Sequence, residues 1–461
     1  MAFPFSVFEE WFSANEFSIK ADFFHFLQFE SISTDPEHRE PCLEAANFLF
    51  SYLEKIGMKA ELLKNTGLPV VFAESKKQDS WPTVLLYQHY DVQPVDPLDL
   101  WDTPPFTPTF KEGKIYARGA SDNKGQCFLT LTALKALKEL LPDLPLYIKV
   151  FIEGEEESGG KGTHEAIAQN KEKLKADFLG VIDFDIPSKD TPSLSMGYRG
   201  LLAVNMECTN AGTDLHSGIH GGIALNPNRI LVELLAKLWD ADGKVAIPHF
   251  YDCIVPLTEE EKKQIDFSFD ETSYRKEFGV GAFCQEKGVS LREANWICPT
   301  LEINGIWGGY TGPGFKTVIP AKAFAKISCR LVPDQDPEKI MKHFQEFILQ
   351  NTPKGADIKI QWHHGAKGYR SSFASKIGKA TAKSMEEVFK KKPCRYTLCG
   401  GAVPIASELA KASGAEVALF GFALDTDNVH APNEHFHWEC FKKGFMTVAR
   451  MLFELSLEKK E

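Results

Sequence analysis

The sequence predicts an α/β fold: a helix-covered, mostly parallel β-sheet domain into which a ferredoxin-like α+β domain is inserted. Helix and strand patterns alternate over residues 1–197 and again over 367–461, which is typical of a parallel sheet covered by helices. Residues 198–366 instead follow the order β-α-β-β-α-β of a split βαβ layer. At 461 residues the chain also exceeds the size of one ordinary hydrophobic core.

The first segment predicts helices and strands in alternation. Apolar residues at helical spacing, Gly57 at the end of the second run and Asp122-Asn123 before the third indicate helices. Short apolar runs between them indicate strands. We expect helices over 5–30, 41–57 and 124–141, and strands over 68–75, 83–89 and 146–152.

The pattern changes after Gly200 and changes back near residue 367. In the inserted part we expect strands over 201–209, 299–306, 322–332 and 357–363, helices over 227–240 and 337–350, and an irregular insertion at about 241–298. In the last part we expect helices over 375–390, 405–411 and 439–457 and a strand over 417–420.

Composition and charge argue against several classes of protein. The 43% hydrophobic and 25% charged residues are typical of a globular chain, and the net charge of −11 without a dense Lys/Arg cluster argues against nucleic-acid binding. The sequence contains no run of about 18 apolar residues, so no membrane span is expected. Residues 1–12 do not resemble a signal peptide. The ten cysteines are scattered, so we expect a reduced, cytoplasmic protein.

The most informative segment is the end of the strand expected over 83–89, where His89-Tyr90-Asp91 follows an apolar run. Side chains alternate along a strand, so His89 and Asp91 point to the same side. The carboxylate can then hold one ring nitrogen while the other is free to bind a metal. Many His-x-Asp pairs lie at a strand end without binding a metal. The metal-binding interpretation therefore depends on the polar segments that follow in the sequence.

Four more segments carry polar residues where strands or turns end. Asp122 lies in a turn before a helix, where a helix N-cap is the alternative interpretation. The acidic run around Glu156 contains no basic residue, and crowded carboxylates repel one another unless a cation lies among them. Asp183 closes another apolar run, and His430 lies in a polar turn. Such a mixture of histidine and carboxylate at one sheet edge suits zinc or a related divalent ion.

The order and spacing of these segments resemble those of the co-catalytic zinc peptidases and deacylases. This family includes carboxypeptidase G, acetylornithine deacetylase, aminoacylase and the carnosinase-type cytosolic dipeptidases, and the resemblance covers nearly the whole chain. It implies a catalytic domain that carries an inserted lid, and a small peptide as substrate. It also implies two divalent ions per chain, with Zn2+ expected and Mn2+ or Co2+ as alternatives, and a homodimer formed through the lid.

The resemblance implies a role for each polar residue of the catalytic domain. One metal would be held by His89 and Asp183 and the other by Glu157 and His430, with Asp122 as the bridge between them. Asp185 is the alternative to Asp183 in the first pair.

Two further acidic residues would complete the chemistry. Asp91 would orient the ligand histidine, and Glu156 would be the general base that takes a proton from the metal-activated water. Glu155 is the competing general base, because the family's motif can be aligned with the acidic run in two registers that differ by one residue.

The lid supplies the residues implied in substrate binding. His216 resembles the histidine that stabilises the tetrahedral oxyanion, in dimeric relatives at the neighbouring subunit's site; a turn histidine is the alternative and His220 the competitor. Thr317 and Arg330 match substrate-binding residues of the family. An arginine fork grips a free carboxylate, although Arg330 lies on a polar strand face and a solvated arginine is the alternative.

The sequence therefore predicts a dinuclear metal dipeptidase for short peptides with a free C-terminal carboxylate. The alternatives are an N-acyl-amino-acid deacylase with the same metal centre and an inactive relative that serves as a binding protein. Ala402 stands where the carnosinase-like dipeptidases usually carry Ser, which removes one possible hydrogen bond to the substrate. The glycines of segment 308–312 do not connect a strand to a helix, so no nucleotide-binding loop is expected.

Overall fold

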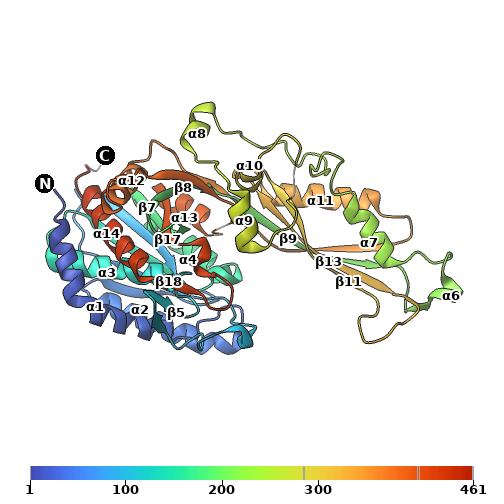
Figure 1. Cartoon of the computed structure of the whole chain (residues 1–461), viewed down its shortest axis with the longest axis horizontal. Helices are drawn as coiled ribbons and strands as arrows, with labels where there is room; N and C mark the ends of the chain where they lie inside the picture. Colours follow the sequence, from blue (N-terminus) through green and yellow to red (C-terminus); the bar gives the residue numbers. More distant parts are fainter. Residues whose placement is uncertain (1, 284–285, 402, 404, 459–461) are drawn as a thin grey trace. The chain divides into compact units, whose positions relative to one another are not determined.

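The computed structural model of the chain describes residues 2–283, 286–401, 403 and 405–458. They fall into two compact units (Figure 1). Unit 1 comprises Met1–Met196, Ser371–Thr397 and Ile405–Glu461, and unit 2 comprises Gly197–Arg370 and Leu398–Pro404. Ala402 lies outside the described residues. The domain boundaries expected from the sequence stay a prediction, because compactness alone does not define a domain.

Unit 1 is built on one sheet with the strand order β1-β2-β6-β3-β7-β17-β8. The central strands β6, β3, β7 and β17 are parallel, whereas β1, β2 and β8 join antiparallel at the two sides. This arrangement confirms the predicted α/β fold with a mostly parallel sheet. The strands are β1 (Lys59–Leu63), β2 (Val70–Glu74), β3 (Thr83–His89), β6 (Tyr147–Glu153), β7 (Phe178–Asp185), β8 (Ser193–Tyr198), β16 (Arg395–Cys399, paired with β8) and β17 (Glu416–Ala423).

Two groups of helices cover this sheet. Helices α1, α3, α12 and α14 contact one another, as do α4, α5 and α13, and both groups contact β7. Helix α3 is buried on almost every side because apolar residues surround its axis. The helices are α1 (Phe5–Leu27), α2 (Arg39–Lys55), α3 (Lys124–Leu140), α4 (Lys161–Gln169), α5 (Lys171–Leu174), α12 (Lys376–Val388), α13 (Ala406–Ser413) and α14 (Trp438–Leu455).

A small antiparallel sheet of unit 1 joins segments that are far apart in the sequence. Its order is β18-β5-β4, from β18 (His435–His437), β5 (Lys114–Tyr116) and β4 (Thr109–Lys111). The pairing of β18 with β5 holds the polar turn around His430 near the segment that leads into α3.

Unit 2 contains a four-stranded antiparallel sheet in the order β11-β13-β9-β14. Buried and exposed residues alternate along β9 and β13, because one sheet face packs on the unit's hydrophobic core together with α7 and α11. This confirms the predicted ferredoxin-like layer. Its elements are β9 (Gly200–Thr209), α7 (Pro227–Ala236), β11 (Thr300–Gly308), β13 (Lys322–Leu331), α11 (Pro337–Asn351) and β14 (Asp357–Ala366).

Further short elements belong to unit 2. The insertion expected to be irregular contains three short helices, two of which begin with capping boxes at Thr258 and Ser290. The short elements are β10 (Leu215–His216), α6 (Ser217–His220), α8 (Glu259–Gln264), α9 (Glu271–Phe278), α10 (Leu291–Trp296), β12 (Val318–Ile319) and β15 (Tyr369–Arg370). In the described ranges of both units, no helix combines the length and the apolar character needed to cross a membrane.

Candidate metal centre

Polar residues follow the central strands of unit 1 where those strands end. His89 is the last residue of β3, Asp183 lies near the end of β7, and the acidic run forms a 3₁₀ turn (η3, Glu156–Ser158) just after β6. Because β6, β3 and β7 are adjacent and parallel, their carboxyl ends meet at one edge, the usual place for a ligand in such a sheet.

Asp122 lies at the centre of the cluster. Its Oδ1 is 3.1 Å from His89 Nε2, and its Oδ2 is 2.9 Å from His430 Nε2. Asp183 Oδ1 lies 3.5 Å from His89 Nε2, and Glu157 Oε1 lies 3.3 Å from His430 Nε2. Two triads with potential metal-ligand atoms therefore share one carboxylate, and Asp122 faces each triad with a different oxygen.

The N-cap interpretation of Asp122 is wrong. The N-cap of α3 is Asn123, and no side chain caps this helix end. The peptide bond between Asp122 and Asn123 is cis. Asn123 Nδ2 donates hydrogen bonds to the carbonyl of Ile182 at 3.0 Å and to Asp183 Oδ1. Through this hydrogen bond Asn123 holds the carboxylate of Asp183 beside that of its chain neighbour Asp122.

Asp91 contacts the ring of His89 with both its backbone carbonyl and its carboxylate. The Nδ1 of His89 lies 3.1 Å from the carbonyl oxygen of Asp91 and 3.3 Å from its Oδ1. Asp91 also accepts hydrogen bonds from Ser33 Oγ at 2.6 Å and from the backbone N–H of Glu157 at 3.0 Å. With Nδ1 engaged on this side, Nε2 faces the two carboxylates of its triad.

Glu155 and Glu156 differ in what their carboxylates contact. Glu155 accepts backbone hydrogen bonds from Leu68 at 3.1 Å and Gly162 at 2.6 Å, and a Cβ at Gly67 or Gly162 would collide with this carboxylate. Its role is thus to hold the turn after β6. Glu156 lies beside the cluster but belongs to neither triad.

The cluster concentrates negative charge in a buried place. Burial raises the pKa of Glu156 well above its usual value; His89 opposes this shift, and Glu157 and Asp183 add to it. Burial also raises the pKa of Asp183 and of Glu157. In the part of the chain that the structure describes, neither lysine nor arginine forms an ion pair with these three carboxylates or with Asp122.

The histidines respond to the same charges. Burial alone would lower the pKa of His89, but Asp183, Asp122 and Asp91 together raise it well above its usual value. The hydrogen bonds with Asp122 and Glu157 raise the pKa of His430 to about 11. For Asp122 itself, burial acts to raise the pKa, but the two histidines lower it strongly.

These observations fit divalent cations. Crowded carboxylates with raised pKa values need a positive charge among them, and the two histidines supply neutral nitrogen ligands once an ion is bound. Nitrogen and oxygen donors without thiolates are a set that zinc accepts. Asp122 is common to both groups, and its two oxygens face different histidines.

Glu434 is a residue of the site that the sequence did not single out, although it lies four residues after His430. It is buried, and it accepts hydrogen bonds from Arg118 at 2.8 Å and from the backbone N–H groups of Gly119, Ser121 and Asp122 at 2.9 to 3.0 Å. Glu434 therefore fixes the backbone that presents Asp122. The signal available in the sequence was a lone Glu closing a polar turn, which is weak.

The residues predicted to bind substrate lie in unit 2. His216 is exposed in β10, and its Nδ1 accepts a hydrogen bond from the Gly218 N–H at 3.0 Å. Thr317 is also exposed, and its carbonyl accepts a hydrogen bond from the backbone of Ser217 at 3.1 Å. Arg330 is half-buried in β13, where its neighbours Cys329 and Leu331 point into the core. Burial lowers the pKa of Arg330.

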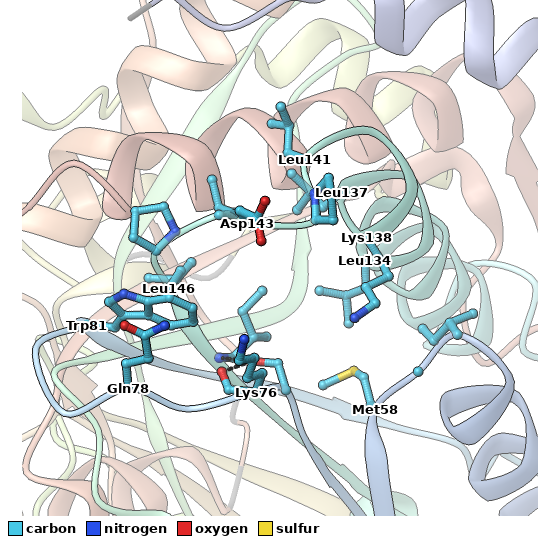
Figure 2. Close-up of a pocket in the computed structure, with 17 residues that line it drawn as sticks. Met58, Lys76, Gln78, Trp81, Leu134, Leu137, Lys138, Leu141, Asp143 and Leu146 are labelled. Carbon is cyan, nitrogen blue, oxygen red and sulfur yellow. Dashed lines mark hydrogen bonds between the residues drawn. The ribbon is translucent and has the colours of Figure 1, made fainter.

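A separate pocket of unit 1 contains none of these residues. Figure 2 shows it at the end of α3, where Leu134, Leu137 and Leu141 face Met58 and Trp81. Its volume is about 320 Å³. Because no predicted site residue lines it, it is not the site of the predicted chemistry.

Comparisons with known proteins agree with the resemblance described above. Residues 85–454 match the model of the peptidase family M20/M25/M40. The Cys-Gly metallodipeptidase DUG1 of Candida albicans is 32% identical over 447 residues, which covers 92% of this chain and 91% of that protein. The β-Ala-His dipeptidase of Rattus norvegicus is 31% identical over 397 residues, covering 84% and 80% respectively.

A solved structure extends the comparison to the fold. The M20 family metallo-carboxypeptidase Sso-CP2 from Sulfolobus solfataricus superposes with a TM-score of 0.88 at 33% identity. The match covers 95% of this chain and 99% of that one. The likeness therefore includes both units and is not confined to the segments that carry the cluster.

Proposed function

Because this chain belongs to the peptidase family M20/M25/M40, we propose that it hydrolyses dipeptides at a dinuclear metal centre built on Asp122. The chain is a metallopeptidase of the dipeptidase type, and its curated relatives are named as dipeptidases. The observation that carries the proposal is the position of Asp122, with one oxygen facing His89 and the other facing His430. The deacylase alternative gains no comparable support.

Within the proposed centre, His89 and Asp183 would hold one ion, Glu157 and His430 would hold the other, and Asp122 would serve both. When bound, two divalent ions of the zinc class polarise a carbonyl group and lower the pKa of a water molecule toward neutrality. Zn2+ is the proposed metal, since nitrogen and carboxylate ligands suit it, and Mn2+ or Co2+ are the alternatives.

Glu156 is the proposed general base. It belongs to neither triad, so its carboxylate oxygens stay available for a proton. In the proposed reaction it accepts the proton of the attacking water and later donates it to the leaving amine. Asp91 and Glu434 act as positioning residues, because their hydrogen bonds hold His89 and the backbone of Asp122.

Unit 2 would select the substrate. Arg330 can grip a C-terminal carboxylate with two parallel N–H donors, and Thr317 can add a hydroxyl contact. His216 would stabilise the oxyanion of the tetrahedral intermediate. Its exposure supports a role in which it meets a group from outside its own unit.

We also propose a homodimer formed through unit 2. Strand β11 is an edge strand of its sheet, and Ile303, Ile306 and Trp307 on it are 37%, 50% and 46% exposed. An exposed apolar edge strand is a surface that a second copy can cover. A reducing, cytoplasmic location is the companion proposal, supported by the buried free thiols of Cys42 and Cys127.

The function can be tested with chelated full-length enzyme and a panel of substrates. We expect no hydrolysis of Cys-Gly or β-Ala-His after chelation and recovery when zinc, manganese or cobalt is returned. Acetylated and succinylated amino acids should react far more slowly than the dipeptides. Faster turnover of the acylated amino acids would contradict the proposed substrate class.

The dimer can be tested with two inactive variants. His216→Ala and Glu156→Gln chains are each expected to be inactive, and mixing them should restore part of the activity if His216 serves the neighbouring subunit. Sedimentation of the same samples gives the oligomeric state. A monomer, or a mixture without recovery, would contradict this proposal without affecting the metal centre.

A further inference from the structure

A third group of potential metal ligands lies in unit 1, apart from the two triads of Asp122. It consists of Asp427, His435 and His437, whose candidate ligand atoms all lie within 4.8 Å of one another. Asp427 ends the 3₁₀ turn after β17 (η4, Asp425–Asp427), and the two histidines lie two residues apart in β18. Side chains at that spacing in a strand share a face, so both histidines point the same way.

Asp427 has one carboxylate oxygen engaged and one that is not. Its Oδ2 accepts hydrogen bonds from the backbone N–H of Leu424 at 2.9 Å and from Ser121 Oγ at 3.0 Å. Its Oδ1 is buried and has no hydrogen-bond partner among the described residues. The side chain is 0% exposed. An unpartnered buried carboxylate oxygen costs free energy, and burial accordingly raises the pKa of Asp427 to about 7. A cation bound at Oδ1 would supply the partner that this oxygen lacks.

Both histidines face that oxygen. Asp427 Oδ1 is 3.7 Å from His435 Nε2 and 3.9 Å from His437 Nε2. These separations are too long for hydrogen bonds. Ligands at 2.0–2.1 Å from a tetrahedral zinc ion are about 3.4 Å apart, so each histidine nitrogen would move a few tenths of an ångström toward Asp427 Oδ1.

The orientation of His435 favours metal binding. Its Nδ1 lies 3.0 Å from the backbone carbonyl oxygen of Asn433, so the proton belongs on that nitrogen. The lone pair of Nε2 then points toward the cluster. A ligand histidine held by a carbonyl through its other nitrogen is the usual arrangement in metal sites. Burial lowers the pKa of His435, and it lowers that of His437 to about 4, which keeps both rings neutral.

Lys114 competes with an ion for this place. Its Nζ lies 3.0 Å from His435 Nε2, and its backbone pairs with His437 in the ladder of β5 and β18. An ammonium group and a metal ion cannot use the same lone pair. The lysine is half-buried at the rim, so its long side chain can move away when an ion binds.

We propose that Asp427, His435 and His437 bind a divalent ion of the zinc class, separate from the ions at Asp122. The ion would join the two ends of the loop 428–434, which carries His430. Three non-glycine residues of that loop, Asn428, His430 and Asn433, have positive φ angles of 56°, 61° and 63°, a conformation that L side chains rarely adopt. A tie between the loop ends would hold this conformation and hence the position of His430.

Metal content of the full-length protein tests the proposal. We expect zinc-loaded His437→Ala protein, measured by mass spectrometry of the metal, to hold one ion per chain fewer than the wild type. His25→Ala, which replaces an exposed histidine of α1 in the same unit, is the matched control and should hold as many ions as the wild type. Equal zinc content of His437→Ala and wild type would overturn the proposal.

A second variant sharpens the test in the opposite direction. Lys114→Met removes the competing ammonium group, so we expect zinc to bind this site about tenfold more tightly, as measured by competition with a chromophoric chelator. Unchanged or weaker binding would contradict the proposed geometry.

The third experiment separates this site from the proposed dipeptidase centre. In an Asp122→Ala background, zinc should still raise the melting temperature, and adding His437→Ala should abolish that rise. If Asp122→Ala protein shows no zinc-dependent stabilisation, the third site does not exist, whatever the fate of the dipeptidase proposal. If stabilisation remains while the wild type lacks peptidase activity, the function fails and this site stands.

Discussion

The cluster around Asp122 in unit 1 and the substrate-binding residues proposed in unit 2 are held in different ways. In unit 1 the ligand candidates are supported by a second layer of buried groups: Asp91 holds His89, and Glu434 holds the backbone of Asp122. In unit 2, His216 and Thr317 are exposed and accept hydrogen bonds from backbone N–H groups of the short helix α6. The cluster around Asp122 is thus held by its own buried surroundings, whereas His216 and Thr317 are open to solvent. We therefore expect substitutions at the supporting residues of unit 1 to lower the free energy of unfolding more than substitutions in unit 2.

The largest effect is expected at Glu156. Glu156→Gln removes the proton acceptor, so we expect kcat to fall by roughly 10²- to 10⁴-fold while bound metal stays at the wild-type level. Steady-state hydrolysis of Cys-Gly and metal analysis of the same preparation provide the two measurements.

Glu155→Gln is the matched control one residue earlier. Because Glu155 binds backbone N–H groups of Leu68 and Gly162, its replacement should lower the free energy of unfolding and leave kcat near the wild-type value. If Glu155→Gln loses turnover and Glu156→Gln keeps it, the two roles must be exchanged.

The next effect concerns stability. Glu434→Gln would leave the buried guanidinium of Arg118 without its charged partner, which typically costs about 3–5 kcal/mol of unfolding free energy. The control in unit 2 is Glu233→Gln, since Glu233 pairs with Arg229 on the exposed surface of α7 and solvent-exposed pairs contribute little to stability. Denaturant titration of both variants measures the difference. Similar losses of unfolding free energy in Glu434→Gln and Glu233→Gln would contradict the expected difference between the two units.

A smaller effect is expected at Arg330. Arg330→Met should raise KM for dipeptides by roughly 10- to 100-fold, because a charge-assisted hydrogen bond is worth about 1.5–3 kcal/mol. The effect should vanish with C-terminally amidated dipeptides, which lack the carboxylate. Lys326→Met, on the same face of β13, should leave KM unchanged. Loss of activity on amidated and free substrates alike would indicate a structural role for Arg330.

The smallest effect is a dependence of stability on pH. The Glu408 carboxylate, hydrogen-bonded to His164, raises the pKa of His164 above 6.5. Stability from this pair is fully present below the unfolded pKa and is lost as pH rises through the folded pKa. The two side chains are 42% and 37% exposed, so the loss should stay below about 1 kcal/mol. His164→Gln should flatten this part of the stability curve; a steeper curve would contradict the sign.

Much of the fold could be predicted because long apolar runs specify the central elements. The strand expected over 83–89 is observed as Thr83–His89, and the helix expected over 124–141 as Lys124–Leu140. The end of an apolar strand that is buried on both faces can be recognised by its first polar residue. His89 and Asp183 mark such ends. Parallel strands then bring those ends together, which is why a metal-binding edge could be expected from the sequence.

The rest depends on contacts that periodicity does not record. Strands β4, β5 and β18 have three residues each, and they form because they pair with one another. The role of Glu434 comes from hydrogen bonds to residues more than 300 positions earlier in the chain. The short helices of the insertion at 241–298 are a different case, since their capping boxes at Thr258 and Ser290 were visible in the sequence.

The central claim is that Asp122 bridges two ions. Anomalous scattering at the zinc edge from crystals of zinc-loaded wild-type protein tests it most directly. We predict two peaks roughly 3.5–4 Å apart, one beside each oxygen of Asp122, with His89 ligating one ion and His430 the other. At this cluster, a single peak, or two ions neither of which is ligated by Asp122, would contradict the claim; a further peak at Asp427 belongs to the separate site proposed there.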